Sequence, residues 1–127
     1  MNRHKLSLLR SRLRDLLRER EACEKVALQH HPMVAASFLE RTFRPSQKRP
    51  YYYLSAPMAG VSRHRYVPAS QAPLWRGRAY EWLRYRKAMT RWVRLSREIE
   101  RALRAMGRQR CVAMPKASLR SPSPPKP

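Results

Sequence analysis

The sequence predicts an α+β protein with two long antiparallel helices, arranged as a coiled-coil-like hairpin, and a small three-stranded antiparallel meander between them in the chain. Two observations lead to this prediction. Apolar side chains recur every three or four residues in two long segments, which is the period of amphipathic helices. The stretch between these segments is rich in aromatic and β-branched residues and contains turn-forming Pro and Gly, which favours short strands. We expect one domain over residues 1–110 and a disordered, basic Ser/Pro-rich tail over residues 111–127.

The first helix is expected within residues 5–29, where apolar side chains follow a heptad pattern that only Arg20 interrupts. Further leucines flank this seam and widen the apolar stripe, which is typical of a helix packed on a core. Pro32 ends the helix, because a proline disfavours the helical conformation of the residue before it. The seam residues are Leu6, Leu9, Leu13, Leu16, Cys23 and Ala27.

Three short segments favour β-structure, and the Tyr-Tyr-Tyr-Leu run at residues 51–54 is the strongest of them. Residues 56–60 have the length of a five-residue hairpin loop, in which Gly60 can supply a positive φ. Residues 45–50 form a longer basic loop between the first two strands. The expected strands are residues 37–44, 51–55 and 61–67.

The second helix is expected to begin after Pro68, with Ser70 as N-cap and Pro73 in the first turn. It continues to Gly107, so about 35 residues would span roughly 50 Å. Eight of its ten seam positions are apolar, which predicts packing against another helix. The seam residues are Trp75, Arg78, Trp82, Tyr85, Met89, Trp92, Ser96, Ile99, Leu103 and Met106.

The second helix is longer than the first by about ten residues, or roughly 15 Å. We expect its last turns to lack an intramolecular partner, so that Ile99, Leu103 and Met106 need another cover. A homodimer, or a larger protein partner bound through residues 96–106, would provide it. This motivates an alternative function, a coiled-coil adaptor that binds an acidic protein.

Charge is the strongest indication of function. The chain has 127 residues with 29 Lys and Arg against 8 Asp and Glu, a net charge of +21. Such an excess repels itself unless a polyanion neutralises it, so we expect nucleic acid, DNA or RNA, as the partner. An anionic membrane surface or an acidic protein is the alternative. No apolar run reaches the length of a membrane span, and we expect a cytoplasmic protein. An organellar transit helix over residues 1–18 is the alternative. It is disfavoured because the same helical pattern continues through acidic residues after residue 18.

Catalysis, metal binding and cofactor binding are not expected. Cys23 and Cys111 lie far apart, and the four histidines lack the paired spacing of a zinc site. Seven of the eight acids fall on the predicted helices among arginines, which indicates surface ion pairs. Glu40 alone lies in a strand, so no carboxylate pair is available for acid–base or metal chemistry.

Cations interleaved with aromatic residues form the candidate binding site. Exposed rings on a sheet can stack on bases while arginines hold phosphates, and the second helix adds an almost uninterrupted row of arginines. Usually such a row is only a solvated helix face, but here the interspersed acids are missing. We predict that nucleic acid is bound by Arg44, Lys48, Arg49, Tyr52, Arg63, Arg65, Arg84, Arg91 and Arg94.

The order of these segments resembles a family of small uncharacterised prokaryotic proteins whose members often occur near transposases and phage genes. The most specific part is the Tyr-Tyr-Tyr-Leu-Ser run at residues 51–55 followed by Arg-Tyr-Val-Pro at residues 65–68, and the likeness covers about residues 8–106. Family members commonly carry a Cys-rich knuckle before the tyrosine strand, where this chain has Arg-Pro-Ser-Gln-Lys-Arg at residues 44–49. The resemblance implies the same fold without a metal site, and an accessory role for a mobile genetic element.

Overall fold

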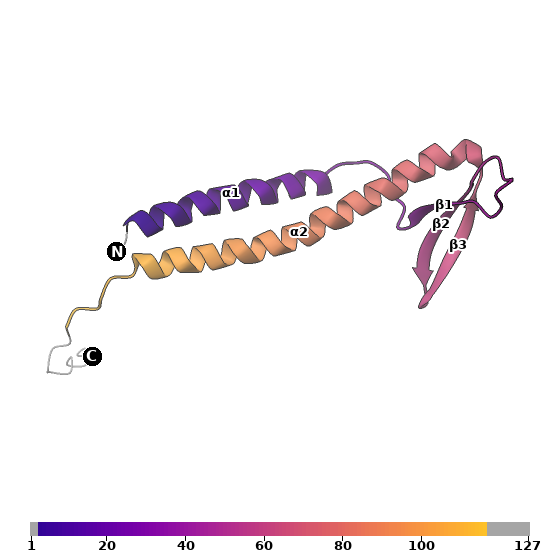
Figure 1. Ribbon diagram of the computed structural model, residues 1–127. Helices are drawn as coiled ribbons and strands as arrows, with labels where there is room; N and C mark the ends of the chain where they lie inside the picture. Colours follow the sequence, from indigo (N-terminus) through magenta and orange to yellow (C-terminus); the bar gives the residue numbers. More distant parts are fainter. Residues whose placement is uncertain (1–2, 117–127) are drawn as a thin grey trace, which may run out of the picture.

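The protein, described by a computed structural model over residues 3–116, consists of a helix, a three-stranded antiparallel sheet and a second, longer helix (Figure 1). The predicted α+β fold, two long helices with a meander between them, is confirmed. Residues 117–127, which make up most of the expected tail, lie outside the described residues. The elements are α1 (Arg3–Ala27), β1 (Ser37–Arg41), β2 (Tyr51–Met58), β3 (Val61–Val67), a 3₁₀ turn (Ala69–Gln71) and α2 (Ala72–Arg110).

The two helices lie side by side and antiparallel, with α1 along the second half of α2 (Figure 1). At 1.5 Å per residue, the 39 residues of α2 span roughly 58 Å and the 25 residues of α1 roughly 37 Å. The predicted seam of α1 is confirmed, and its Leu16 is 1% exposed. The core between the helices contains Leu16, Cys23, Leu95, Ile99 and Ala102, with Leu13, Ala88 and Trp92 packed around it.

The part of α2 without a helical partner is its beginning, so the prediction of an uncovered C-terminal end is wrong. Residues 28–36 run beside α2 without forming a helix or strand, and the Val34 amide donates a hydrogen bond to the Arg78 carbonyl at 3.1 Å. This segment and the sheet occupy the start of α2, and α1 therefore packs on the rest. Ile99 is only 4% exposed in the core, whereas Leu103 is 52% exposed.

The seam of α2 also follows a different row of side chains from the predicted one. Trp92 and Ile99 contribute as predicted, but the buried row beside them contains Leu95 and Ala102 instead of Ser96 and Leu103. Both rows fit a heptad spacing, and the observed one brings no polar atom into the interface. The Ser96 hydroxyl is nevertheless enclosed at the margin, without a hydrogen-bond partner among residues 3–116.

The ends of α2 differ from the expectation as well. Ser70 belongs to the preceding 3₁₀ turn, and Gln71 occupies the N-cap position without a side-chain cap. Pro73 lies in the first turn as predicted. The helix continues through Gly107, because one helical Gly costs only about 1 kcal/mol. Arg108 and Arg110 in the last turn interact favourably with the helix dipole.

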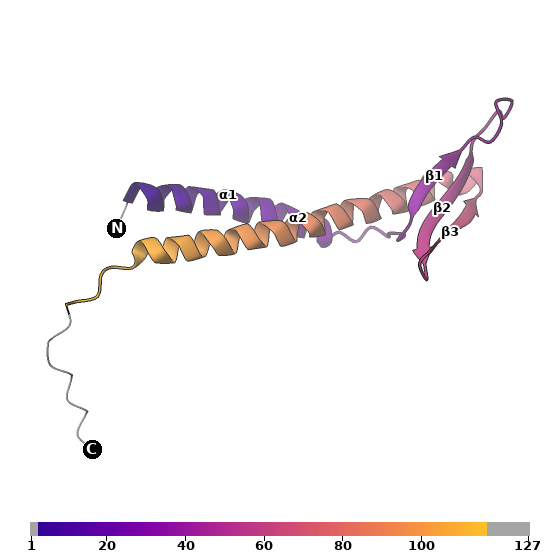
Figure 2. The same cartoon turned by 60° about the horizontal axis from the view of Figure 1, so that its bottom comes forward.

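The sheet has the order β1-β2-β3, and α2 crosses one of its two faces (Figure 2). β1 ends at Arg41, three residues earlier than predicted. β2 extends to Met58 and not to Ser55, so the five-residue loop prediction is wrong: Ala59 and Gly60 alone form the turn. Their φ angles are 52° and 79°, as a two-residue type I′ turn requires.

Replacing Ala59 by Asn is expected to raise the free energy of unfolding by about 0.5–1 kcal/mol. Ala59 adopts a left-handed conformation at φ 52°, which disfavours a residue with an ordinary Cβ, whereas Asn-Gly is the preferred type I′ pair. Chemical denaturation measures the gain. Gly60→Ala serves as the control and should destabilise the protein, since φ at Gly60 is 79°. A loss of stability in Ala59→Asn would show that the turn has another geometry.

Within residues 3–116, no helix is both long enough and apolar enough to cross a bilayer.

Candidate nucleic-acid interface

Four aromatic rings gather on the face of the sheet that is turned away from α2. Tyr53 of β2 lies opposite Tyr66 of β3 in the strand register, with 5.9 Å between ring centroids. Tyr51 lies 6.4 Å from Tyr66. Phe43, from the β1–β2 connection, lies 5.9 Å from Tyr51 and 6.4 Å from Tyr53. We call these four residues, Phe43, Tyr51, Tyr53 and Tyr66, the aromatic face.

Tyr52 points to the opposite side, because side chains alternate along a strand. Its ring stacks on Phe38 at 5.5 Å, and the Arg76 guanidinium of α2 lies 5.8 Å from the Tyr52 ring centroid and 4.9 Å from that of Phe38. Arg76 also pairs with Glu40 at 2.7 Å. Tyr52 is therefore half-buried between sheet and helix, and its position favours a structural role over the predicted contact with a base.

The connection between β1 and β2 carries three of the predicted basic residues, Arg44, Lys48 and Arg49, all of them exposed. The half-buried Gln47 fixes the shape of this loop. Its amide oxygen accepts from the Phe43 backbone N–H at 3.0 Å, while its amide nitrogen donates to the carbonyls of Arg41 and Arg49. Gln47 thereby places Phe43 beside the tyrosines. The sequence analysis counted Phe43 within the first strand and gave neither residue a place in the site, because a loop held by one Gln side chain has no local sequence signal.

Arg63 and Arg65 lie on the helix-facing side of β3, not on the aromatic face. The strand register places them opposite Ala56 and Leu54 of β2. Both side chains are exposed, and both line a groove of about 880 Å³ between the sheet and the start of α2, which Trp75 closes on the helix side. The structure therefore places these two cations on the same side of the sheet as Tyr52, and separates them from the aromatic face.

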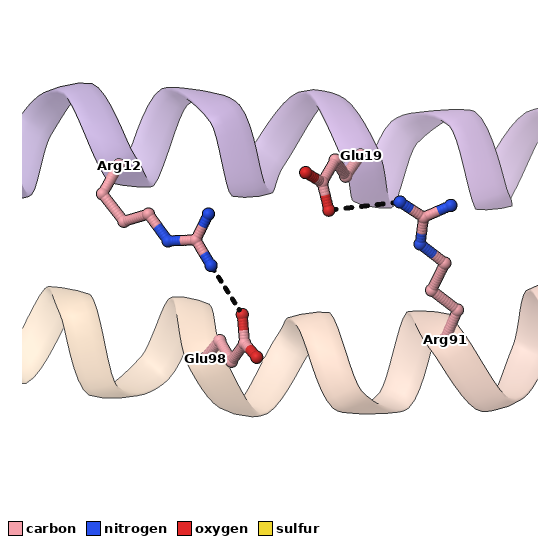
Figure 3. A network of polar contacts seen from close by, with 4 residues as sticks. All are labelled: Arg12, Glu19, Arg91 and Glu98. Carbon is pink, nitrogen blue, oxygen red and sulfur yellow. Dashed lines mark hydrogen bonds and ion pairs between the residues drawn. The ribbon is translucent and has the colours of Figure 1, made fainter.

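Two of the three predicted arginines of α2 are engaged within the molecule. Arg91 pairs with Glu19 of α1 at 3.3 Å, close to the reversed pair between Arg12 and Glu98 at 3.3 Å (Figure 3). Arg84 donates to the side-chain oxygen of Gln29 at 2.6 Å and lies 3.7 Å from Glu81. These contacts hold the helices in one antiparallel register. They favour a structural role for Arg84 and Arg91.

The third predicted arginine of α2, Arg94, begins a row of five exposed arginines at steps of three and four residues. This spacing places them along one side of α2, opposite to the side that carries Leu95 and Ile99. Over residues 94–108 the row is roughly 21 Å long. The sequence already indicated a row of arginines along this helix, but of these five residues only Arg94 was among the predicted contacts. We call Arg94, Arg97, Arg101, Arg104 and Arg108 the arginine stripe.

Few carboxylates neutralise the arginine stripe. Of the two acids in residues 94–108, Glu98 turns toward Arg12 of α1, and Glu100 pairs with Arg104 at 3.0 Å. Among residues 3–116, the other four stripe arginines have no ion-pair partner. The described part of the chain also contains no group of three or more His, Cys, Asp or Glu that could hold a metal ion. The chemistry that the two surfaces offer is phosphate binding and ring stacking.

Comparison with known proteins yields no similar family, no similar curated protein and no similar solved structure.

Proposed function

We propose that the protein is a non-catalytic nucleic-acid-binding protein that holds a phosphate backbone with the arginine stripe. The observation that carries this proposal is the outer side of α2, where four of five exposed arginines have no carboxylate partner within residues 3–116. Guanidinium groups bind phosphate oxygens through forked donors. A row roughly 21 Å long can contact several consecutive phosphates and release their counter-ions.

The position of the apolar side chains favours nucleic acid over an anionic membrane. A helix that lies on a bilayer needs an apolar side free to enter the lipid. Along the second half of α2 the apolar side faces α1, where Leu95, Ile99 and Ala102 are buried and Trp92 packs against them. The arginine stripe lies on the remaining side. It can track a charged backbone without displacing the core.

The acids support a binding role without catalysis. Six of the eight carboxylates form ion pairs with arginines in the described residues, and all six are at least 25% exposed. Such groups keep ordinary surface environments and stabilise helices or the contact between helix and sheet. A cytoplasmic location and an accessory role for a mobile genetic element remain predictions, the second one from the resemblance alone.

The proposal is tested by ranking the affinities of the full chain for four ligands at one ionic strength. These are duplex DNA, single-stranded DNA, RNA, and vesicles containing about 30% anionic lipid. The vesicles test the alternative that the positive charge of the protein serves to bind an anionic membrane surface. We expect micromolar or tighter binding to nucleic acid at about 0.1 M salt, and weaker binding to vesicles. Stronger binding to the vesicles, or no binding to any nucleic acid, would contradict the proposal.

An acidic protein partner remains the second candidate, and the groove beside Arg63 and Arg65 favours it. Leu54, Met58 and Trp75 give this groove an apolar lining, while the two arginines supply positive charge. A peptide with both acidic and apolar side chains fits that surface.

The homodimer predicted through residues 96–106 is less strongly motivated by the structure, because α1 already covers Ile99. Leu103 nevertheless remains 52% exposed. Light scattering at high protein concentration and moderate salt distinguishes monomer from dimer.

A further inference from the structure

The aromatic face is an exposed surface in the folded chain. Phe43 is 63% exposed, Tyr66 56% and Tyr51 46%, and Tyr53 between them is half-buried. α2 crosses the other face of the sheet (Figure 2), and the exposed fractions of these rings leave the aromatic face open to solvent within residues 3–116. A cluster of large apolar rings left in water on a small domain marks a surface that binds something.

The rings are also held in place before any ligand arrives. Tyr51, Tyr53 and Tyr66 project from paired strands, and Gln47 fixes the loop that carries Phe43. The pairs of rings that include Tyr66 meet at interplanar angles of 64° and 72°, so they contact edge to face. This leaves parts of the ring faces open to a planar ligand. A preorganised surface loses little conformational entropy on binding.

Cations border the aromatic face. Arg41 lies opposite Tyr51 in the strand register and therefore on the same face of the sheet. Arg44, next to Phe43, and Lys48 and Arg49 in the same loop are exposed. None of these four side chains has an ion-pair partner in the part of the chain that the structure describes. The occupant should accordingly combine flat aromatic groups with repeated negative charge.

We propose that the aromatic face binds single-stranded nucleic acid, stacking unpaired bases on Phe43, Tyr51, Tyr53 and Tyr66 while the loop cations hold the adjacent phosphates. A duplex keeps its base faces stacked inside the helix, so only an unpaired strand can offer them to a sheet. This inference rests on the proposed function and names the form of nucleic acid. It assigns the strand to the sheet, separate from the arginine stripe on α2.

The test compares Tyr66→Thr with the parent protein on oligothymidylate and oligouridylate of about 15 nucleotides, and on a duplex of the same length. Threonine keeps a high β-propensity, so the strand should persist. We expect single-strand affinity to fall about 5- to 150-fold, the range for loss of one base–ring stack. Duplex affinity should change by less than about twofold. Tyr66→Phe, which keeps the ring, should bind single strands like the parent.

Two further variants keep the result interpretable. Phe43→Ala removes a ring from a loop, without altering a strand, and should also weaken single-strand binding. Tyr80→Ala removes a tyrosine of similar exposure, 62%, from α2 and should leave that affinity unchanged. If Tyr66→Thr and Phe43→Ala both bind single strands as tightly as the parent, or weaken duplex binding equally, the inference fails and the proposed function stands. If the parent binds no nucleic acid, both fail.

Discussion

Replacing Leu16 by Ala is expected to lower the free energy of unfolding by about 3–5 kcal/mol. Leu16 is 1% exposed, the most completely buried large side chain of the described residues, and it packs in the core between α1 and α2. Truncation removes its transfer free energy and leaves a cavity that two rigid helices cannot close. A domain of this size has a total stability of about 5–15 kcal/mol, so the variant should be near unfolding at 37 °C. Urea denaturation followed by circular dichroism measures the loss.

Aliphatic residues of different exposure on the same helices provide the controls. Leu8 of α1 is 58% exposed, and Leu8→Ala should change stability by less than about 0.5 kcal/mol. On α2, Ile99→Ala should cost about 2–5 kcal/mol, whereas Leu103→Ala should cost well below that, since Leu103 is 52% exposed. Equal losses at Ile99 and Leu103 would mean that α1 packs on the row of α2 predicted from the sequence and not on the observed one.

The sequence was sufficient for the elements and their order. Both helices show a heptad pattern over many turns, and the tyrosine run has strong β-propensity, so local physics determines these segments. β3 was predicted with its observed bounds, Val61–Val67. Element ends were less certain because Gly107, which ends many helices, is here tolerated inside α2.

The arrangement of the elements could not be predicted from periodicity. A nine-residue connection at residues 28–36 allows α1 to pack on either part of α2, and the choice depends on where the sheet docks. The sequence also left open which face of β3 is turned toward the helices. One face carries Arg63 and Arg65, and the other carries His64 and Tyr66, so neither is plainly apolar. Because side chains alternate along a strand, Tyr52 must face the opposite side of the sheet from its two neighbouring tyrosines. The alternation does not determine which of the two sides packs against α2.

Replacing Arg94, Arg97 and Arg101 together by Gln is expected to weaken duplex DNA binding by about two to three orders of magnitude at 0.1 M salt. Each arginine that neutralises one phosphate contributes about 0.9 to the slope of log affinity against log salt concentration, so three arginines contribute about 2.7. At 0.1 M salt, tenfold below 1 M, this slope corresponds to about 2.7 decades of affinity. Gln has a helix propensity close to that of Arg, so α2 should persist. Fluorescence anisotropy with a labelled duplex measures the affinity.

Two controls separate position from total charge. Lys at the same three positions keeps the charge and should retain most of the affinity, with some loss from the missing forked donors. Gln at Arg3, Arg10 and Arg14 removes the same charge from exposed positions of α1 and should have a much smaller effect. An equal loss from both Gln triples would show that the charge acts as a diffuse field and that the arginine stripe is not the binding surface.

The claim that the arginine stripe binds a phosphate backbone is tested most directly by the salt dependence of duplex DNA binding. The affinity of the parent and of the Arg94, Arg97 and Arg101 triple Gln variant is measured between about 50 and 200 mM salt. If the stripe holds the backbone, log affinity falls steeply with log salt in the parent, and the slope of the variant is shallower by about 2.7. A parent slope near zero, or the same slope in both proteins, would contradict the account.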